Sequence, residues 1–188
     1  VTSVGATGTI TMPGSVTNDI NIAWANDTVA TNYNVTLQPG TLTVSAKSIT
    51  GKDMTVGTLP DVTYNGTEQS VQIASVKDGT ASLIATQDYT VKSGNKATNV
   101  GDNTLVIEGK GNYKGIARAT WSLVAKDVTI TPDAKSKTYG AADPELTYST
   151  DLTAGSALET AFNTAKSGAL SYTGTDVGAY IIGIGTLK

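Results

Sequence analysis

The sequence of 188 residues contains no cysteine and no histidine. Without cysteine the chain forms no disulfide and carries out no thiol chemistry. Without histidine it lacks the side chain that most often serves as an acid–base catalyst and as a zinc ligand. The missing cysteine fits either a reducing cytosol or a bacterial surface protein that folds without bridges. These absences argue against enzymes that depend on a thiol, an imidazole or a histidine- or cysteine-bound zinc ion.

Charge is also scarce, because charged residues make up 15% of the chain and the net charge is −3. No basic cluster suited to a phosphate backbone is present, so nucleic acid is not an expected partner. No apolar run approaches the roughly 18 residues that a membrane span needs, and the residues from Val1 onward do not resemble a signal peptide. If the protein is exported, we expect its signal to lie outside this sequence.

Threonine, valine, glycine and alanine are the abundant residues. Threonine and valine favour strands because their branched side chains suit a pleated surface, and glycine and asparagine supply turns. Short alternating runs are separated by turn signals at intervals of about 8 to 12 residues. The pattern predicts an all-β chain of tandem Ig-like β-sandwich modules, with β-grasp-like modules as the alternative.

A stretch that occurs twice organises the chain. Residues 32–47 and 112–126 both begin with Asn-Tyr, alternate, and close on Ala-Lys, and the closing lysines are 126 − 47 = 79 residues apart. A fixed spacing of this kind predicts tandem modules. The predicted modules are the C-terminal part of a first one at 1–46, a complete middle one at 47–126, and the N-terminal part of a third at 127–188. The chain is therefore expected to start inside one domain and to stop inside another.

Alternating apolar residues predict the individual strands. Ile20, Ile22 and Trp24 fall on one face of a strand. The predicted strands lie near 8–12, 20–24, 33–37 and 42–44, then 54–59, 71–76, 82–84, 89–91, 104–108 and the segment around Trp121, then 128–132, 143–148, 170–172 and 179–185. Turns are predicted at Asn26-Asp27 and Asn65-Gly66.

One segment has a helical pattern instead. Apolar residues lie at helical spacing between 157 and 162, and Ser156 with Glu159 three residues later forms a capping box. We therefore expect a short helix near 156–166.

The third module carries a family resemblance. Lys137-Thr138-Tyr139-Gly140, then Asp-Pro-Glu-Leu at 143–146, Gly-Ala-Tyr-Ile at 178–181 and Gly-Thr-Leu at 185–187, resemble the MBG-type repeat of the YGX class. Such repeats occur in tandem in large bacterial surface proteins and adhesins. Residues 32–36 with 39–44 are similar to the way such repeats end. The middle module resembles a related surface repeat at 64–66, 88–91 and 109–115.

The resemblance implies an extracellular or cell-surface location, with neighbouring repeats of the same protein as partners. We interpret the chain as a non-catalytic stalk or spacer of a repetitive bacterial adhesin or extracellular fibre. One alternative is a module that binds glycan or mucin. Another is a fibre subunit whose copies associate end to end, each adding a strand to an exposed edge. The family supplies no functional residues, so no catalytic, cofactor or metal residue is predicted and ligand-binding residues stay unknown.

Aromatic residues are the first candidates for a binding surface. Structurally, tyrosines at strand positions are core or cross-strand packing residues. The functional alternative is a platform on which sugars stack, formed with Trp24 or Trp121. Trp121 takes the place of Leu42 in the repeat, which favours a core position for it. The tyrosines concerned are Tyr64, Tyr89, Tyr113, Tyr139, Tyr148, Tyr172 and Tyr180.

Carboxylates are the second set of candidates. Most lie near turns, where aspartate caps its own backbone. No sequence pattern indicates an acid pair for glycoside hydrolysis. Calcium at a loop or domain junction is kept as an alternative to the expected lack of cofactor, although the sequence contains no D-x-D-x-D loop. The aspartates are Asp61, Asp88, Asp102, Asp133, Asp143 and Asp176.

Covalent modification is the last class of candidate. Lys47 and Lys126, at the module boundaries, are candidates for an isopeptide crosslink, which needs a buried lysine, asparagine and acid in one cluster. Residues 26–28, 34–36 and 65–67 match the N-glycosylation pattern, and 27–29 matches an O-glycosylation motif of some bacterial surface proteins. The same residues are equally ordinary turn sequences in a threonine-rich chain.

Overall fold

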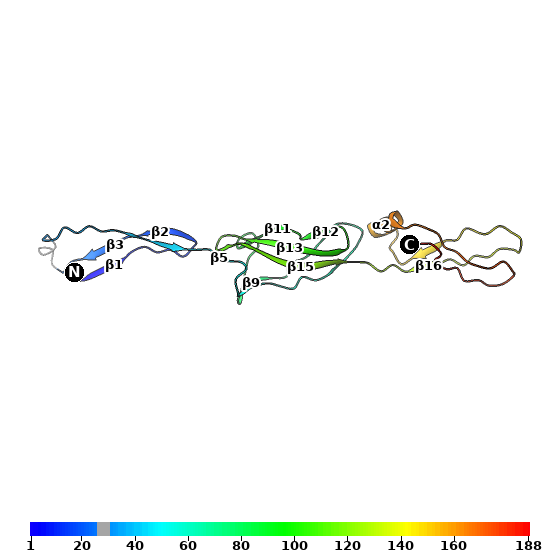
Figure 1. Ribbon diagram of the computed structural model, residues 1–188, viewed down its shortest axis with the longest axis horizontal. Helices are drawn as coiled ribbons and strands as arrows, with labels where there is room; N and C mark the ends of the chain where they lie inside the picture. Colours follow the sequence, from blue (N-terminus) through cyan, green and yellow to red (C-terminus); the bar gives the residue numbers. More distant parts are fainter. Residues whose placement is uncertain (26–30) are drawn as a thin grey trace. The chain divides into compact units, whose positions relative to one another are not determined.

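The computed structural model describes residues 1–25 and 31–188. The predicted turn at 26–27 and the glycosylation motifs at 26–28 and 27–29 lie outside the described residues. The described part consists of short β-strands and one short helix (Figure 1). The all-β prediction is confirmed, while the Ig-like sandwich topology stays a prediction.

The described residues gather into two compact units. One unit comprises residues 1–59, 73–93 and 104–119, and the other comprises residues 60–72, 94–103 and 120–188. Both units draw residues from the predicted middle module. The division of the chain into modules at 46/47 and 126/127 therefore stays a prediction.

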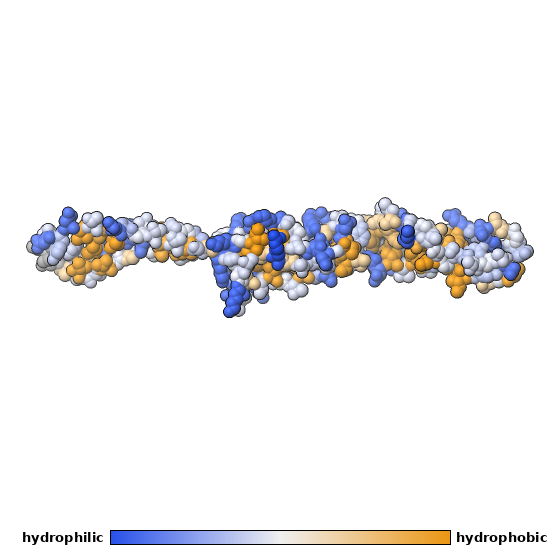
Figure 2. All heavy atoms as spheres, in the orientation of Figure 1, coloured by the Kyte–Doolittle hydropathy of each residue, from blue (hydrophilic) through white to orange (hydrophobic). Residues whose placement is uncertain are grey.

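Two two-stranded sheets account for the described strands before residue 46. Strand β1 (Ser3–Ala6) pairs antiparallel with β3 (Ile20–Ala23), and β2 (Gly14–Asn18) pairs antiparallel with β4 (Gly40–Val44). Ile20, Ile22 and Trp24 are half-buried while their neighbours are exposed, which confirms the predicted alternation. Figure 2 shows apolar side chains on the visible surface over β1 and β3.

Two predicted strands in this region are wrong. Residues 8–12 form no strand, because Gly8 lies against Asn18: its N–H donates to Asn18 Oδ1 at 3.0 Å, and a Cβ there would be 2.8 Å from the Asn18 Cα. Residues 33–37 are exposed and form no strand, because no described segment pairs with them. Alternation marks a segment as strand-compatible, but a strand also needs a hydrogen-bonding neighbour.

The residues between 47 and 124 contain the largest sheets. A four-stranded sheet has the order β11-β13-β15-β7, and a three-stranded antiparallel sheet has the order β10-β9-β6. Two short pairs add to these, β12 with β8 and the parallel pair β14 with β5. The strands are β5 (Lys47–Ser48), β6 (Met54–Val56), β7 (Val62–Thr63), β8 (Gln69–Ser70), β9 (Val76–Asp78), β10 (Ala81–Ser82), β11 (Tyr89–Ser93), β12 (Lys96–Ala97), β13 (Gly101–Gly109), β14 (Tyr113–Lys114) and β15 (Ile116–Val124).

The strand predictions here are largely confirmed, but their bounds shift. The predicted strand at 71–76 is replaced by β8, which ends at Ser70, and by β9, which begins at Val76. Val71 and Val76 are nevertheless both buried. Gly66 has a φ of +92° and Gly79 a φ of +59°, conformations that suit glycine, so the turn predicted at Asn65-Gly66 is confirmed.

The hydrophobic core is concentrated in this part of the chain. Among the described residues, twelve of the thirteen buried apolar side chains lie between Ile49 and Leu123, and the thirteenth is Leu170. Trp121, Leu105 and Ile107 are at most 2% exposed. The prediction that Trp121 is a core residue is confirmed.

The C-terminal part has few strands. Strand β16 (Ile130–Pro132) pairs antiparallel with β17 (Tyr148–Thr150), and helix α2 (Ala157–Ala165) follows. Ser156 caps the helix by accepting a hydrogen bond from the Glu159 N–H at 3.1 Å, and the Glu159 carboxylate accepts from the Gly155 N–H at 2.6 Å. The predicted helix and its Ser156 cap are confirmed, whereas the reciprocal bond of a capping box is displaced by one residue, because Glu159 accepts from the Gly155 N–H and the Ser156 N–H donates to the Thr153 carbonyl.

Three predicted strands in this part are wrong or displaced. The strand predicted at 143–148 begins only at Tyr148, after Pro144, which has no N–H to donate. The segments 170–172 and 179–185 share a single antiparallel bridge, between Ser171 and Gly183. Gly183 and Gly185 raise the entropic cost of a regular strand there.

Candidate functional site

A wide hollow lies in the C-terminal part of the chain. It has a volume of about 960 Å³ and is lined by residues 135–146 and 172–182. We call it the C-terminal groove. Three of the candidate tyrosines, Tyr139, Tyr172 and Tyr180, line it together. The groove is therefore the place where the predicted aromatic candidates meet.

A charged and hydrogen-bonded cluster lies at one wall of this groove. Lys137 Nζ and the Tyr172 hydroxyl both donate to Asp143 Oδ1. The hydrogen bond from Lys137, followed by that from Tyr172, lowers the pKa of Asp143, and the same contact with Asp143 raises the pKa of Lys137. At neutral pH the cluster is therefore a carboxylate held by one ammonium and one phenol. All three groups are solvent-accessible.

The aromatic rings of the groove are partly paired. The rings of Tyr172 and Tyr180 lie 6.3 Å apart between centroids at an angle of 36°, and the Tyr180 hydroxyl donates to the Asp176 carbonyl at 3.0 Å. A Cβ at Gly174 would lie 2.0 Å from the Tyr180 ring, so glycine is needed there to admit the ring. Tyr139 is 73% exposed. The groove thus combines a tyrosine pair, an open tyrosine and a charged cluster.

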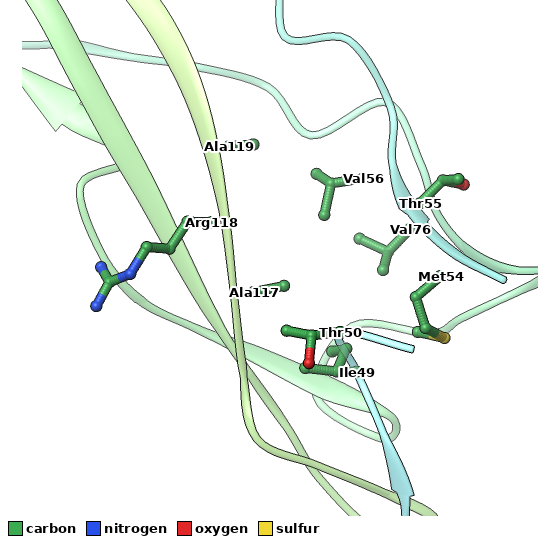
Figure 3. A pocket seen from close by; sticks show the side chains of 9 residues that line it. All are labelled: Ile49, Thr50, Met54, Thr55, Val56, Val76, Ala117, Arg118 and Ala119. Atoms are coloured by element: carbon green, nitrogen blue, oxygen red, sulfur yellow. The ribbon is translucent and has the colours of Figure 1, made fainter. Parts of the chain in front are cut away.

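A smaller hollow of about 250 Å³ lies beside β6, β9 and β15 (Figure 3). Figure 3 shows the Arg118 side chain pointing away from the other labelled residues. The remaining lining is apolar apart from two threonines, Thr50 and Thr55. None of the residues that line it is acidic. Most of this lining is therefore apolar.

The other candidate tyrosines lie apart from the groove. Tyr89 is buried, and Tyr64, Tyr113 and Tyr148 are half-buried. Tyr113 donates to Asp78 at 3.2 Å. Lys166 Nζ lies 5.0 Å from the centre of the Tyr148 ring. These contacts fit the packing interpretation of these four residues.

The two tryptophans are placed differently. Trp121 is buried and its Nε1 donates to the Gly94 carbonyl at 2.8 Å. Trp24 is half-buried and its ring stacks on Tyr33, with 5.9 Å between centroids and 20° between planes. Neither tryptophan is among the residues that line the C-terminal groove.

Several candidate aspartates hold local structure. Asp88 accepts from the Ile84 N–H at 2.8 Å, Asp102 accepts from the Ser122 hydroxyl at 2.6 Å, and Asp133 accepts from the Thr147 hydroxyl. Asp61 and Asp176 are exposed. Within the described ranges, no three acidic residues come together in a group that could hold a metal ion.

The structure also shows the surroundings of the candidates for covalent modification. Lys47 Nζ lies 2.6 Å from Asp78 Oδ1 with its side chain 49% exposed, and Lys126 is exposed, so neither lies in the buried cluster that an isopeptide bond requires. In the motif at 65–67, Asn65 Oδ1 accepts from the Thr67 N–H at 3.1 Å and from its hydroxyl at 2.8 Å, a local turn bond. Residues 34–36 are exposed.

Sequence reasoning missed two clusters, Lys137–Asp143–Tyr172 and Lys47–Asp78–Tyr113. Tyr172 is 29 residues from Asp143, and Tyr113 is 35 residues from Asp78. Such pairings depend on the fold and leave no local spacing to detect. The one sequence signal was the Lys-Thr-Tyr-Gly motif itself, which supplies Lys137 and Tyr139 to the groove.

In the part of the chain that the structure covers, no helix has the length and apolar character needed to cross a membrane.

Comparison with curated proteins gives no match, and comparison with solved structures gives none either. One family model does match, that of the MBG domain (YGX type), a domain typical of repetitive bacterial surface proteins. The match covers residues 128–188, the part of the chain that holds β16, β17, α2 and the groove. Residues 128–188 are therefore similar to the MBG domain of the YGX type.

Proposed function

We propose that the chain is a non-catalytic spacer segment of a repetitive protein on the bacterial cell surface, with neighbouring repeats as its partners. The observation that carries the proposal is the recurrence of one closing strand, β4 and β15, 79 residues apart (126 − 47 between the closing lysines), in a chain that continues into an MBG domain. A chain built from successive β-units suits a role in holding other parts of a protein at a distance.

The junctions between the strands support this proposal. Strand β4 ends at Val44 and β5 begins at Lys47, so two residues join them, and β15 ends at Val124 while β16 begins at Ile130. Short connections have little freedom to bend, unlike long flexible linkers. A spacer needs this property because a slack chain would not maintain a distance.

Distance measurement by pulsed electron resonance tests the proposal. The chain has no cysteine, so Thr17→Cys in β2 and Ser149→Cys in β17 give two unique sites for spin labels on exposed strand positions. We expect one narrow distance distribution that does not change with salt. A matched variant with four glycines inserted after Ser45 should broaden it. A broad distribution in the unmodified chain would overturn the spacer proposal.

A second candidate function rests on the C-terminal groove. Its exposed Tyr139, its Tyr172–Tyr180 pair and the polar Lys137–Asp143 cluster together offer ring faces and hydrogen-bonding groups, the combination that suits a sugar chain. We include glycan or mucin binding as an alternative for this part of the chain. It requires an extracellular location, as does the spacer proposal.

Glycan-array and mucin-binding measurements on the whole chain test this alternative. If a glycan binds in the groove, Tyr139→Ala should weaken binding by roughly fivefold, the equivalent of about 1 kcal/mol for one lost ring contact. Tyr33→Ala is the matched control, because Tyr33 is also exposed but lies outside the groove. A passive spacer would bind no glycan, and the distance measurement would be unaffected by Tyr139→Ala.

A further inference from the structure

Helix α2 has little cover of its own. None of its residues, all of which the structure describes, is buried, and Leu158, Ala161 and Phe162 are half-buried. Just beyond its C-terminal end, Lys166 Nζ lies 5.0 Å from the centre of the Tyr148 ring on β17. Because a short helix in a protein is stabilised mainly by packing, α2 depends on the contacts made at its two ends.

The N-terminal end of α2 lies against a turn 91 residues earlier in the chain (157 − 66). A Cβ on Gly66 would lie 2.4 Å from the Ala157 carbonyl carbon and 2.5 Å from the Leu158 nitrogen. These are backbone atoms of the helix, which cannot swing aside as the end of a flexible side chain can. Gly66 is half-buried, although Asn65 and Thr67 on either side of it are exposed. Glycine is therefore required at this position by the close approach of the helix.

The turn itself is firmly held. Asn65 Oδ1 accepts from the N–H of Thr67 at 3.1 Å and from its hydroxyl at 2.8 Å. The Tyr64 N–H donates to the Val124 carbonyl at 2.9 Å, which ties the turn to the end of β15. The turn is thus a fixed surface on which the helix end rests.

The contact lies beside the connection between β15 and β16. Strand β15 ends at Val124 and β16 begins at Ile130, so residues 125–129 join them. The turn at 65–67 and helix α2 belong to the same compact unit. A single connection is one point of attachment, about which the following segment can rotate. A second contact removes this rotation, because two points of attachment fix an orientation.

We propose that the turn at 65–67 is the docking surface for the N-terminal end of α2, the helix of the part that is similar to the MBG domain. Gly66 is the residue that determines the fit, because any larger residue would place its Cβ inside the helix backbone. The docked helix then fixes how residues 128–188 follow the end of β15. The docking does not depend on the spacer or the glycan function.

Distance measurement by pulsed electron resonance between the two elements tests the docking. Thr63→Cys in β7 and Asn163→Cys in α2 give label sites at exposed positions of a chain without cysteine. We expect one narrow distance distribution, which Gly66→Ala broadens or shifts because the new Cβ displaces the helix. Gly115→Ala is the matched control and should leave the distribution unchanged. Gly115 has nearly the same φ, +90° against +92°, but a Cβ there would lie 3.7 Å from Ser48 Oγ, an ordinary contact.

The control separates the helix contact from backbone strain. Both substitutions place alanine at a φ that disfavours it, so strain alone would affect the two variants alike. A broad native distribution, an unchanged one in Gly66→Ala, or equal broadening in both variants would overturn the docking. A broad distribution between positions 63 and 163, together with a narrow one between positions 17 and 149, would overturn the docking and leave the spacer proposal in place.

Hydrogen exchange in α2 provides a second test without labels. The Glu159 N–H, which donates to Ser156 Oγ, should exchange several-fold faster in Gly66→Ala than in the native chain, because the first turn of the helix loses the surface on which it rests. In Gly115→Ala the rate should stay at the native value. An unchanged rate in Gly66→Ala would contradict the docking.

Circular dichroism checks that the variants fold. If Gly66→Ala does not fold, Asn65→Ala takes its place, because it removes the bonds that hold the turn and adds no atom at Gly66. It should speed exchange of the Glu159 N–H in the same way, and a native rate in Asn65→Ala would then count against the docking.

Discussion

Trp121 shows how much a single side chain contributes to this fold. It is 2% exposed among the apolar residues of the middle part, and its indole N–H donates to the Gly94 carbonyl at 2.8 Å. The same position in the first repeat holds Leu42, which is 38% exposed. The larger residue therefore lies on β15, which has β13 and β7 as neighbours, and the smaller one lies on β4, which pairs with β2 in the part of the chain that the structure describes.

Trp121→Ala should lower the free energy of unfolding of the middle part by about 3 to 5 kcal/mol, because it leaves a cavity and removes a buried hydrogen bond. Urea unfolding followed by circular dichroism measures this change. Tyr139→Ala is the matched control and should change stability by less than about 0.5 kcal/mol, since Tyr139 is largely exposed. Equal losses in the two variants would contradict the core role of Trp121.

Asp78 is the residue that should make stability depend on pH. Its carboxylate accepts from Lys47 Nζ at 2.6 Å and from the Tyr113 hydroxyl at 3.2 Å. The hydrogen bond from Lys47 is the main cause that lowers the pKa of Asp78 in the folded chain. Because the folded pKa lies below the unfolded one, the stabilising contribution is present above the unfolded value and is lost as pH falls through the folded value.

We therefore expect the melting temperature of the native chain to fall between about pH 5 and pH 2, and to fall less in Asp78→Asn, whose side chain does not titrate. Thermal melts across this range measure the difference. Asp61→Asn, which removes an exposed acid outside the cluster, is the control and should keep the native profile. Parallel profiles for the native chain and Asp78→Asn would show that the cluster adds nothing to stability.

At the scale of elements, the sequence predicts strands well where a neighbour exists to pair with them. The predicted strands at 89–91, 104–108 and around Trp121 became β11, β13 and β15, which pair in one sheet. The alternating residues 33–37 became no strand, because alternation records what a strand can bury and not which segment lies beside it. The segments at 170–172 and 179–185 form no strand for a second reason. Glycine weakens a strand, and the two segments share one isolated β-bridge instead of a continuous ladder.

The helix was predictable because its signals are local. Its cap, its first-turn acid and its apolar spacing all fall within ten residues of chain, from 156 to 165. The groove was not predictable to the same extent, because it joins residues 135–146 to residues 172–182. Tyr139 and Lys137 were visible as a motif, whereas their proximity to Tyr172, Tyr180 and Asp143 follows from the fold alone.

Ser156→Ala should lower the stability of the C-terminal part by about 1 kcal/mol, because the cap bond to the Glu159 N–H is lost. The helical contribution to the circular dichroism of the chain, followed on heating, measures this effect. Ser167→Ala is the matched control, since the hydrogen bonds of Ser167 to Lys188 are made by its backbone. A change of the same size in the control would show that the cap is not the cause.

At the scale of the whole molecule, apolar burial is unevenly distributed along the chain. Twelve of the thirteen buried apolar residues among those described lie between 49 and 123, although the chain has 188 residues. The strands before 46 form two-stranded sheets, which are marginally stable without a packed face. Stability should therefore be highest in the middle of the sequence and lower on both sides, independently of where the domain boundaries fall.

Hydrogen exchange resolved by residue tests this distribution. We expect slow exchange for backbone amides of β13 and β15, where Leu105, Ile107 and Leu123 are almost fully buried, because their opening requires the core to unfold. Amides of β1 to β4 should exchange orders of magnitude faster in a dilute sample, because only local opening is needed. Uniform protection from β1 to β15 in the dilute sample would contradict the uneven distribution, since it would require the outer sheets to open only together with the core.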